Sequence, residues 1–403
     1  MIDKKTNRKR YILLVLGFIV MLFAGVAYAW SIFKAPLMDE FGWSIGQLAV
    51  NYFLTQSFFS IGSISCGFFS KKLGTRNTYH MGMILSFLGF FLSSKLDGSA
   101  IWPLFITYGV ILGLGVGFIY SVTIATISKW FPDKSGVCSG ALMSGYGMST
   151  LVLGKVAGIL IDMPAIGWRK TYVIMAVSLA IMFLVMGFVI KAPGEKDNLP
   201  VHASVKNKRN VRDYSVKEAL TSAHFYRFLI YSVLILMVGN SVFSIAKDIL
   251  VHAGASSSVA VTLVGIVSLL GCITRVTNGA FLDRYGIKKT MTLTSCGNIL
   301  AAGVLLISFL TGSYVITVIG MLLVGLVYGL LPSLIPYYPA EYFGTKNNSL
   351  IFPFITTNMI FSSGITTVIT AQIPKMGYII PFTIVFLLAA SSLIVVFLLK
   401  DPD

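Results

Sequence analysis

Two positively charged side chains stand inside long apolar segments of the sequence. Arg275 lies in "SLLGCITRVTNGAFLDRYGIKK", residues 268–289, eight residues before the polar turn at Asp283. Lys155 lies in "LVLGKVAGIL", residues 151–160. A charge at such a depth in a hydrocarbon layer is costly and marks a functional-site hypothesis by default. Because a guanidinium offers two parallel N–H donors that match the two oxygens of a carboxylate, these residues indicate binding of a small carboxylate anion.

Arg275 is predicted to face water rather than lipid. Eight residues of helix place it about 12 Å from the nearer end of its span, too deep for easy snorkelling. All 15 acidic residues fall in turns, tails or span ends, and the closest are Asp162 and Asp248. The alternative is an arginine that bonds helix carbonyls and serves only packing. Its helical neighbours form a small, polar stripe that consists of Ser268, Gly271, Cys272, Asn278 and Gly279.

The direction of Lys155 depends on the shape of its helix. Tyr146 precedes it by nine residues, so on an ideal helix the two side chains point to opposite sides. If Tyr146 faces a cavity, Lys155 does so only where the Gly145–Gly154 region bends the helix. The alternatives are an outer-gate lysine that pairs with Asp162 or Asp248, and a lysine that snorkels outwards.

The elements that position these residues are predicted to be membrane-spanning helices. Of 403 residues, 56% are hydrophobic and 11% are charged, whereas a soluble protein carries about 25% charged residues. Apolar runs of about 20 residues mark transmembrane helices, and the first run is too long for a signal peptide. Twelve spans are predicted, near residues 11–33, 43–69, 78–96, 101–129, 136–161, 168–190, 223–247, 258–282, 289–311, 314–340, 348–372 and 377–399.

The lysines and arginines predict the orientation of these spans. Most of the 31 basic residues lie on the side of the N-terminal tail and of a polar linker, so the positive-inside rule puts both termini and the linker in the cytoplasm. Ser215 and Glu218 have capping-box spacing and predict a short helix at the end of the linker. The predicted domains are a tail at 1–10, a six-helix bundle at 11–190, the linker at 191–222 and a second six-helix bundle at 223–400.

An internal repeat relates the two bundles. The turn "GFFSKKLGTRNT" begins at Gly67, and the turn "GAFLDRYGIKKT" begins at Gly279, 212 residues later. The same shift aligns "KWF" at 129–131 with "EYF" at 341–343. Two six-helix halves related by one offset are typical of duplicated transporters.

The repeated turns carry a family resemblance. "GAFLDRYGIKK" resembles the signature turn of the major facilitator superfamily, and "YAWSIF", "KWFPDKSGVCSG", "SGYG" and "EYFGTKN" are similar to the oxalate/formate antiporter family. "SIAKDIL" and the lysine of "LGKVAG" resemble a subgroup associated with monocarboxylates such as pyruvate. The resemblance implies an all-α polytopic membrane protein with twelve transmembrane helices in a 6+6 pseudo-symmetric fold. It also implies a cytoplasmic gate at the signature turn, with Gly279, Asp283, Arg284 and Gly286.

The resemblance further implies which side chains bind the substrate. The first, fourth, fifth and tenth helices line the cavity in this superfamily, and phenol groups there can donate one hydrogen bond to a carboxylate. Members of the oxalate/formate family carry tyrosine at the positions of Tyr28, Tyr120 and Tyr146, although packing is the alternative for each aromatic. The predicted substrate-binding residues are Arg275, Lys155, Tyr28, Trp30, Tyr120, Tyr146, Tyr328 and Asn358.

Three departures from the family bear on substrate and coupling. Oxalate-specific members resemble each other in a lysine on the eleventh helix, where this chain has Ile355 or Met359. One central arginine suits a monocarboxylate better than a dianion, although Lys155 could supply a second charge. Lys71 replaces the aspartate of the first signature turn, and Gly109 replaces an arginine often found in proton-coupled members. Exchange or facilitated transport is favoured because no acidic residue or histidine lies mid-span, while Asp248 and His252 leave proton symport open.

The expected function is secondary transport of small monocarboxylates by alternating access. Oxalate/formate exchange, proton-coupled symport and a carboxylate-sensing receptor of transporter fold are the alternatives. No enzyme activity is expected, because no nucleophile–base pair lies in the spans, and the scattered cysteines predict no metal site and no cofactor. The expected partners are a small carboxylate anion and membrane lipid. No nucleic acid is expected, because the basic residues form no single patch. The chain is expected to act as a monomer in the plasma membrane, as in a bacterial inner membrane.

Overall fold

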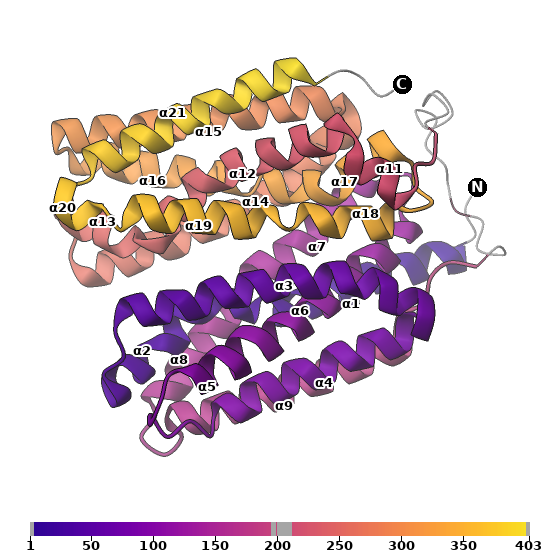
Figure 1. Cartoon of the computed structure of the whole chain (residues 1–403), viewed down its shortest axis with the longest axis horizontal. Coiled ribbons are helices and arrows are strands. Elements are labelled where there is room, and N and C mark those ends of the chain that lie inside the picture. Colours follow the sequence, from indigo (N-terminus) through magenta and orange to yellow (C-terminus); the bar gives the residue numbers. More distant parts are fainter. Residues whose placement is uncertain (1–3, 195–198, 200–211, 400–403) are drawn as a thin grey trace. The chain divides into compact units, whose positions relative to one another are not determined.

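The computed structural model describes residues 4–194, 199 and 212–399, without the side chains at 4, 5, 27, 28, 31, 45, 46, 49, 257, 258 and 261. Its ordered secondary structure is helical throughout this described part (Figure 1). The chain forms two compact units. The first comprises Met1–Lys208 and Phe352–Thr357, and the second comprises Arg209–Ile351 and Asn358–Asp403.

The first unit contains six helical stretches in the described residues. Within it, α3 lies beside α6, α4 beside α9, and α1 beside α7. The elements, in chain order, are α1 Lys4–Ala24, η1 Gly25–Ala29 and α2 Trp30–Phe41; α3 Ile45–Leu73; α4 Thr75–Ser93; α5 Trp102–Leu104, η2 Phe105–Leu112, α6 Gly113–Ile127 and η3 Ser128–Trp130; α7 Ser135–Ser149, η4 Thr150–Gly154 and α8 Lys155–Asp162; and α9 Gly167–Val189.

The second unit repeats the same pairings, because α14 lies beside α16, α15 beside α21, and α12 beside α19. Its elements are α11 Val216–Thr221; α12 Ala223–Ser244 and α13 Ala246–His252; α14 Ser257–Tyr285; α15 Ile287–Thr311; α16 Tyr314–Tyr328 and α17 Leu331–Phe343; α18 Asn348–Ile355, α19 Asn358–Thr370 and α20 Ile373–Met376; and α21 Ile379–Leu398. Part of α18 is grouped with the first unit.

The helices match the predicted spans in place. Among the described residues, nine helices are long and apolar enough to cross a membrane. The three predicted spans near 11–33, 43–69 and 78–96 are not among these nine, but they coincide with α1–α2, α3 and α4. The predicted domain bounds at 191 and 222 remain predictions.

The 212-residue shift predicted from the turns also relates whole helices. α3 and α14 each have 29 residues, and their bounds differ by that shift. Ser44 caps the first of them and Ser256 caps the second, each through its side-chain oxygen. Gly74 and Gly286 end them with φ angles of 82° and 79°, a left-handed region that glycine enters without the strain of a Cβ.

Close helix contacts obey the same shift. At four glycines on the fourth and tenth spans, a β-carbon would collide with a backbone carbonyl oxygen of the neighbouring helix, so glycine lets the two backbones touch. The pairs are Gly113 against Thr55 and Gly325 against Val267, then Gly117 against Phe59 and Gly329 against Gly271. The duplication is therefore visible in atomic contacts as well as in sequence.

Several spans depart from regular α-helix. η2 and η4 are π-helical, and η1 is 3-10. The tenth span breaks at residues 329–330 and the eleventh at 356–357. Irregular backbone in a membrane protein is tolerated where it is buried in protein or lines a cavity, and π-bulges occur frequently at functional sites.

The end of the linker is fastened to the turn between α17 and α18. The Tyr214 amide donates to the Phe343 carbonyl over 3.0 Å, and Asn347 Nδ2 donates to the Tyr214 carbonyl over 2.7 Å. Ser215 and Glu218 form the predicted capping box at the start of α11, which confirms the short helix. The hydrogen bonds from Ser215 lower the pKa of the Glu218 carboxyl. Most of the linker lies outside the described residues.

Candidate functional site

Arg275 lies on α14 with only 9% of its surface exposed. The Ser333 hydroxyl of α17 donates to its backbone carbonyl over 3.2 Å. The 212-residue shift places Ser63 and Ser121 at the equivalent positions of the first unit, and these two hydroxyls are hydrogen-bonded to each other. The equivalent positions are therefore hydrogen-bonded in both units, through two hydroxyls in the first and through the Ser333 hydroxyl and the Arg275 backbone carbonyl in the second.

The small, polar stripe beside Arg275 packs partly against the break between α16 and α17. Gly271 touches Gly329, and Asn278 Nδ2 donates to the Leu330 carbonyl over 2.6 Å. Leu330 lies in the break of the tenth span, where its carbonyl is not part of a continuous helix. The stripe that was predicted to face a cavity thus contacts the non-helical backbone of the tenth span, one helical turn from Arg275.

Tyr328, the last residue of α16, is seated against α12. A β-carbon at Gly239 would collide with its ring, and the Phe243 ring centroid lies 4.9 Å from its own. Its hydroxyl donates to Asn240 Oδ1 over 3.3 Å, and Asn240 Nδ2 donates to Ser362 Oγ over 3.0 Å. Sequence reasoning selected Tyr328 but missed Asn240.

A signal for Asn240 was present in the repeat. Asn240 stands 212 residues after Tyr28, and Asn358 stands 212 residues after Tyr146. Each asparagine therefore takes the position of a tyrosine already selected in the first half. Asn358 is fully buried at the start of α19, and neither amide atom has a hydrogen-bond partner among the described residues.

The aromatic residues predicted for the first unit divide into two groups. Tyr120 and Tyr146 are in edge contact at 5.4 Å, and Phe59 packs on both. Trp30 instead packs 4.6 Å from Tyr108, and its indole N–H donates to a backbone carbonyl, that of Leu48, over 3.2 Å. The side chain of Tyr28 lies outside the described residues.

Lys155 is exposed and follows the π-helical turn η4 directly. On a regular helix, nine residues would separate it from Tyr146 by about 180°. One π turn inserts an extra residue without adding a further 100° of rotation. The angle between Tyr146 and Lys155 around the helix axis therefore falls from about 180° to about 80°. The irregularity that the sequence required is therefore present in the predicted region. Among the described residues, no ion pair joins Lys155 to Asp162.

The whole-chain comparison decides the family. The sequence profile of the Major Facilitator Superfamily matches residues 13–367. The chain belongs to the Major Facilitator Superfamily. A solved structure of the proton:xylose symporter XylE, bound to 6-bromo-6-deoxy-D-glucose, is similar over 97% of this chain and 96% of that chain, with a TM-score of 0.78 and 13% identity. At that identity the likeness shows the fold alone.

Relatives connect this superfamily member to carboxylate transporters. The uncharacterised MFS-type transporter YhjX of Escherichia coli is 26% identical over 85% of this chain and 82% of its own length. The oxalate:formate antiporter of Oxalobacter formigenes is 27% identical over 46% of this chain and 44% of its own. Human monocarboxylate transporter 10 is 27% identical over 37% and 28%. The predicted resemblance is confirmed, and the protein is a multi-pass transporter.

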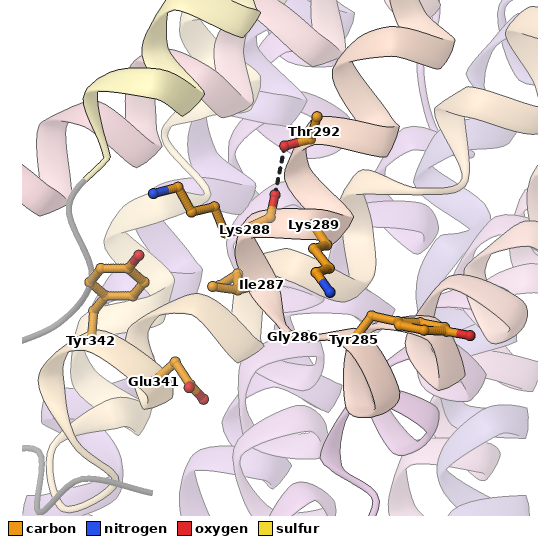
Figure 2. Close-up of a pocket in the computed structure, with 8 residues that line it drawn as sticks. All are labelled: Tyr285, Gly286, Ile287, Lys288, Lys289, Thr292, Glu341 and Tyr342. Carbon is orange, nitrogen blue, oxygen red and sulfur yellow. Dashed lines mark hydrogen bonds between the residues drawn. The ribbon is translucent and has the colours of Figure 1, made fainter.

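The turn that resembles the superfamily's signature lies at the end of α14. Gly279 is buried, Asp283 is half-buried, and the exposed Arg284 lies 5.2 Å from the Tyr285 ring centroid. The turn at Gly286 borders a pocket of about 340 Å³. Figure 2 shows its lining, with basic side chains from α15 and acidic and aromatic ones from α17: Lys288, Lys289, Glu341 and Tyr342.

The residues predicted for coupling lie on α13. Asp248 and His252 are both exposed, one turn apart. The His252 ring lies 4.8 Å from the Tyr378 ring, and both residues line a pocket of about 620 Å³. His252 therefore lines a pocket of the second unit whose lining does not include Arg275.

Proposed function

We propose that this transporter carries small monocarboxylates of the pyruvate, lactate and formate class, with Arg275 as the residue that binds the carboxylate. The observation that carries the proposal is a guanidinium nine-tenths buried on α14. One helical turn away, Asn278 donates to the Leu330 carbonyl in the break of the tenth span, and Ser333 of the same span donates to the Arg275 carbonyl. A guanidinium in such a place is a strong bidentate donor to a carboxylate. The names of the relatives, an oxalate:formate antiporter and monocarboxylate transporters, support the same substrate class.

The eleventh span favours a monoanion. Ile355 is fully buried and apolar, and the polar residue nearby, Asn358, is neutral. The second carboxylate of a dianion would therefore have no positively charged partner at these positions of the eleventh span. Oxalate/formate exchange remains the second candidate, because Lys155 follows a π turn that rotates it toward the face of Tyr146.

Transport is proposed to proceed by alternating access of the bundles at 11–190 and 223–400, with Gly279, Asp283, Arg284 and Gly286 at the gate. Exchange or facilitated transport is favoured over proton symport, since the ionisable pair Asp248 and His252 lies away from Arg275 along the chain and on an exposed surface. Both termini are proposed to be cytoplasmic, and the protein to act as a monomer in a bacterial inner membrane.

Counterflow in proteoliposomes tests the substrate. Vesicles loaded with unlabelled pyruvate, lactate or formate should accumulate the labelled acid transiently, whereas vesicles loaded with xylose should not. Saturable carboxylate binding without counterflow would favour the receptor alternative. Uptake driven by an inward proton gradient alone would contradict pure exchange.

Lys155→Gln tests the second charge. We expect the Kd for oxalate to rise about fivefold, the effect of an exposed ion pair of about 1 kcal/mol, and the Kd for pyruvate to change less than about twofold. Titration calorimetry on the purified protein measures both. Lys170→Gln is the matched control, since Lys170 is an exposed lysine of the same unit whose ammonium donates to the Ala165 carbonyl. Equal Kd values for oxalate before and after Lys155→Gln would indicate a snorkelling lysine.

A further inference from the structure

A directional chain of hydrogen bonds joins three spans of the second unit. Ser362 Oγ donates to the Met359 carbonyl over 3.3 Å, so it accepts from Asn240 Nδ2. The Asn240 amide is thereby oriented with Oδ1 toward α16, where it accepts from the Tyr328 hydroxyl. The chain runs from α16 through α12 to α19.

The hydrogen-bond chain occupies the only donor that the Tyr328 side chain has. A phenol has one O–H, and a carboxylate can only accept hydrogen bonds. As long as the Tyr328 hydroxyl donates to Asn240 Oδ1, it cannot donate a hydrogen bond to a carboxylate. Both Tyr328 and Asn240 are half-buried.

A carboxylate is the stronger acceptor for that proton. Hydrogen bonds to an ionised oxygen are roughly twice as strong as those between neutral groups. Gly239 and Phe243 pack against the Tyr328 ring from α12 and keep its hydroxyl beside Asn240. Tyr328 also directly precedes Gly329, which packs against Gly271 one turn from Arg275.

We propose that Asn240 is a positioning residue that holds the Tyr328 hydroxyl by a hydrogen bond and releases it to donate to the substrate carboxylate instead. The inference rests on the proposed function, since the competitor is the anion bound by Arg275. Loss of the Tyr328–Asn240 bond loosens α16 from α12 only when substrate is present. Binding of the carboxylate at Arg275 is thereby linked to the contact between α12 and α16.

A double-mutant cycle in pyruvate binding tests this exchange. Tyr328→Phe should raise the Kd about fivefold, the usual effect of one hydrogen bond. Asn240→Leu, which removes the competing acceptor, should lower the Kd by roughly two- to fivefold and lower the maximal rate of counterflow. In the Tyr328→Phe background, the same substitution should leave the Kd unchanged. Asn240→Ser, too short to reach Tyr328, should act in the same direction as Asn240→Leu.

Asn298→Leu is the matched control. Asn298 is a buried asparagine that donates to α12, through the Ile235 carbonyl at 3.3 Å, and its loss should not change the Kd for pyruvate. If Asn240→Leu raises the Kd, or shifts it equally with and without Tyr328, the exchange is refuted while the proposed function stands. If the wild type binds no carboxylate, or binds it equally after Arg275→Gln, the proposed function itself fails and this inference falls with it.

Discussion

Arg275→Gln is expected to raise the Kd for pyruvate about 150-fold and to abolish counterflow at substrate concentrations near the wild-type Kd. A buried, charge-assisted pair contributes about 3 kcal/mol when one partner is truncated, which corresponds to that factor. Glutamine keeps a hydrogen-bond donor on a shorter side chain but removes the charge and the fork of two parallel N–H groups. Binding is measured by calorimetry and by the ligand-induced shift in thermal unfolding.

Two variants make the Arg275 result specific. Arg275→Lys keeps the charge without the bidentate geometry and should fall between wild type and glutamine. Arg76→Gln removes an exposed arginine of the first unit, whose guanidinium lies 4.4 Å from the Phe188 ring centroid, and should leave the Kd for pyruvate unchanged. Undiminished counterflow by Arg275→Gln would show that this arginine serves packing and would overturn the assignment.

Asp133→Ala is expected to lower the free energy of unfolding by about 3 kcal/mol, because it leaves a buried guanidinium without its carboxylate. Arg10 Nη1 lies 2.7 Å from Asp133 Oδ1, and the two side chains are only 4% and 12% exposed. The pair ties the start of α1 to the turn before α7. The Arg10 guanidinium also lies 5.0 Å from the Phe131 ring, so its position depends on several groups of this turn. Thermal unfolding in detergent measures the loss.

Glu40→Gln is the matched comparison for that prediction. Glu40 and Arg169 are also 2.7 Å apart, but their side chains are 41% and 45% exposed. Solvent screens such a pair, so the expected loss is less than about 1 kcal/mol. Similar melting temperatures for the two variants would show that burial does not decide the strength of the Arg10–Asp133 pair.

Much of the fold could be predicted from local patterns. Apolar run length located the helices, because a span must satisfy its backbone internally over a fixed thickness. The spacing of Ser215 and Glu218 predicted a cap that the structure contains, because a capping box depends on residues three apart. The offset read from two turns also relates the bounds of α3 and α14 in the structure.

The candidate site was predictable in part. The sequence located Arg275 at depth, since a charge interrupts an apolar run wherever it stands, and the structure buries it. Trp30 was selected by its place on the first helix, yet its indole N–H is bonded to the Leu48 carbonyl. Helix position predicts which span an aromatic belongs to but does not predict which backbone group it meets.

The sequence by itself determined a duplicated, twelve-span transporter with one deep arginine, because hydropathy, charge bias and repeat offset are all properties of local segments. Only the tertiary structure decided the partners of the polar side chains. The Tyr328–Asn240 and Asn240–Ser362 bonds join residues 88 and 122 positions apart. Helical periodicity predicts the face on which a residue lies, whereas its neighbour depends on how helices distant in the chain pack. The π turn before Lys155 likewise changes the face of the helix on which Lys155 lies, and the spacing of residues in the sequence does not predict that turn.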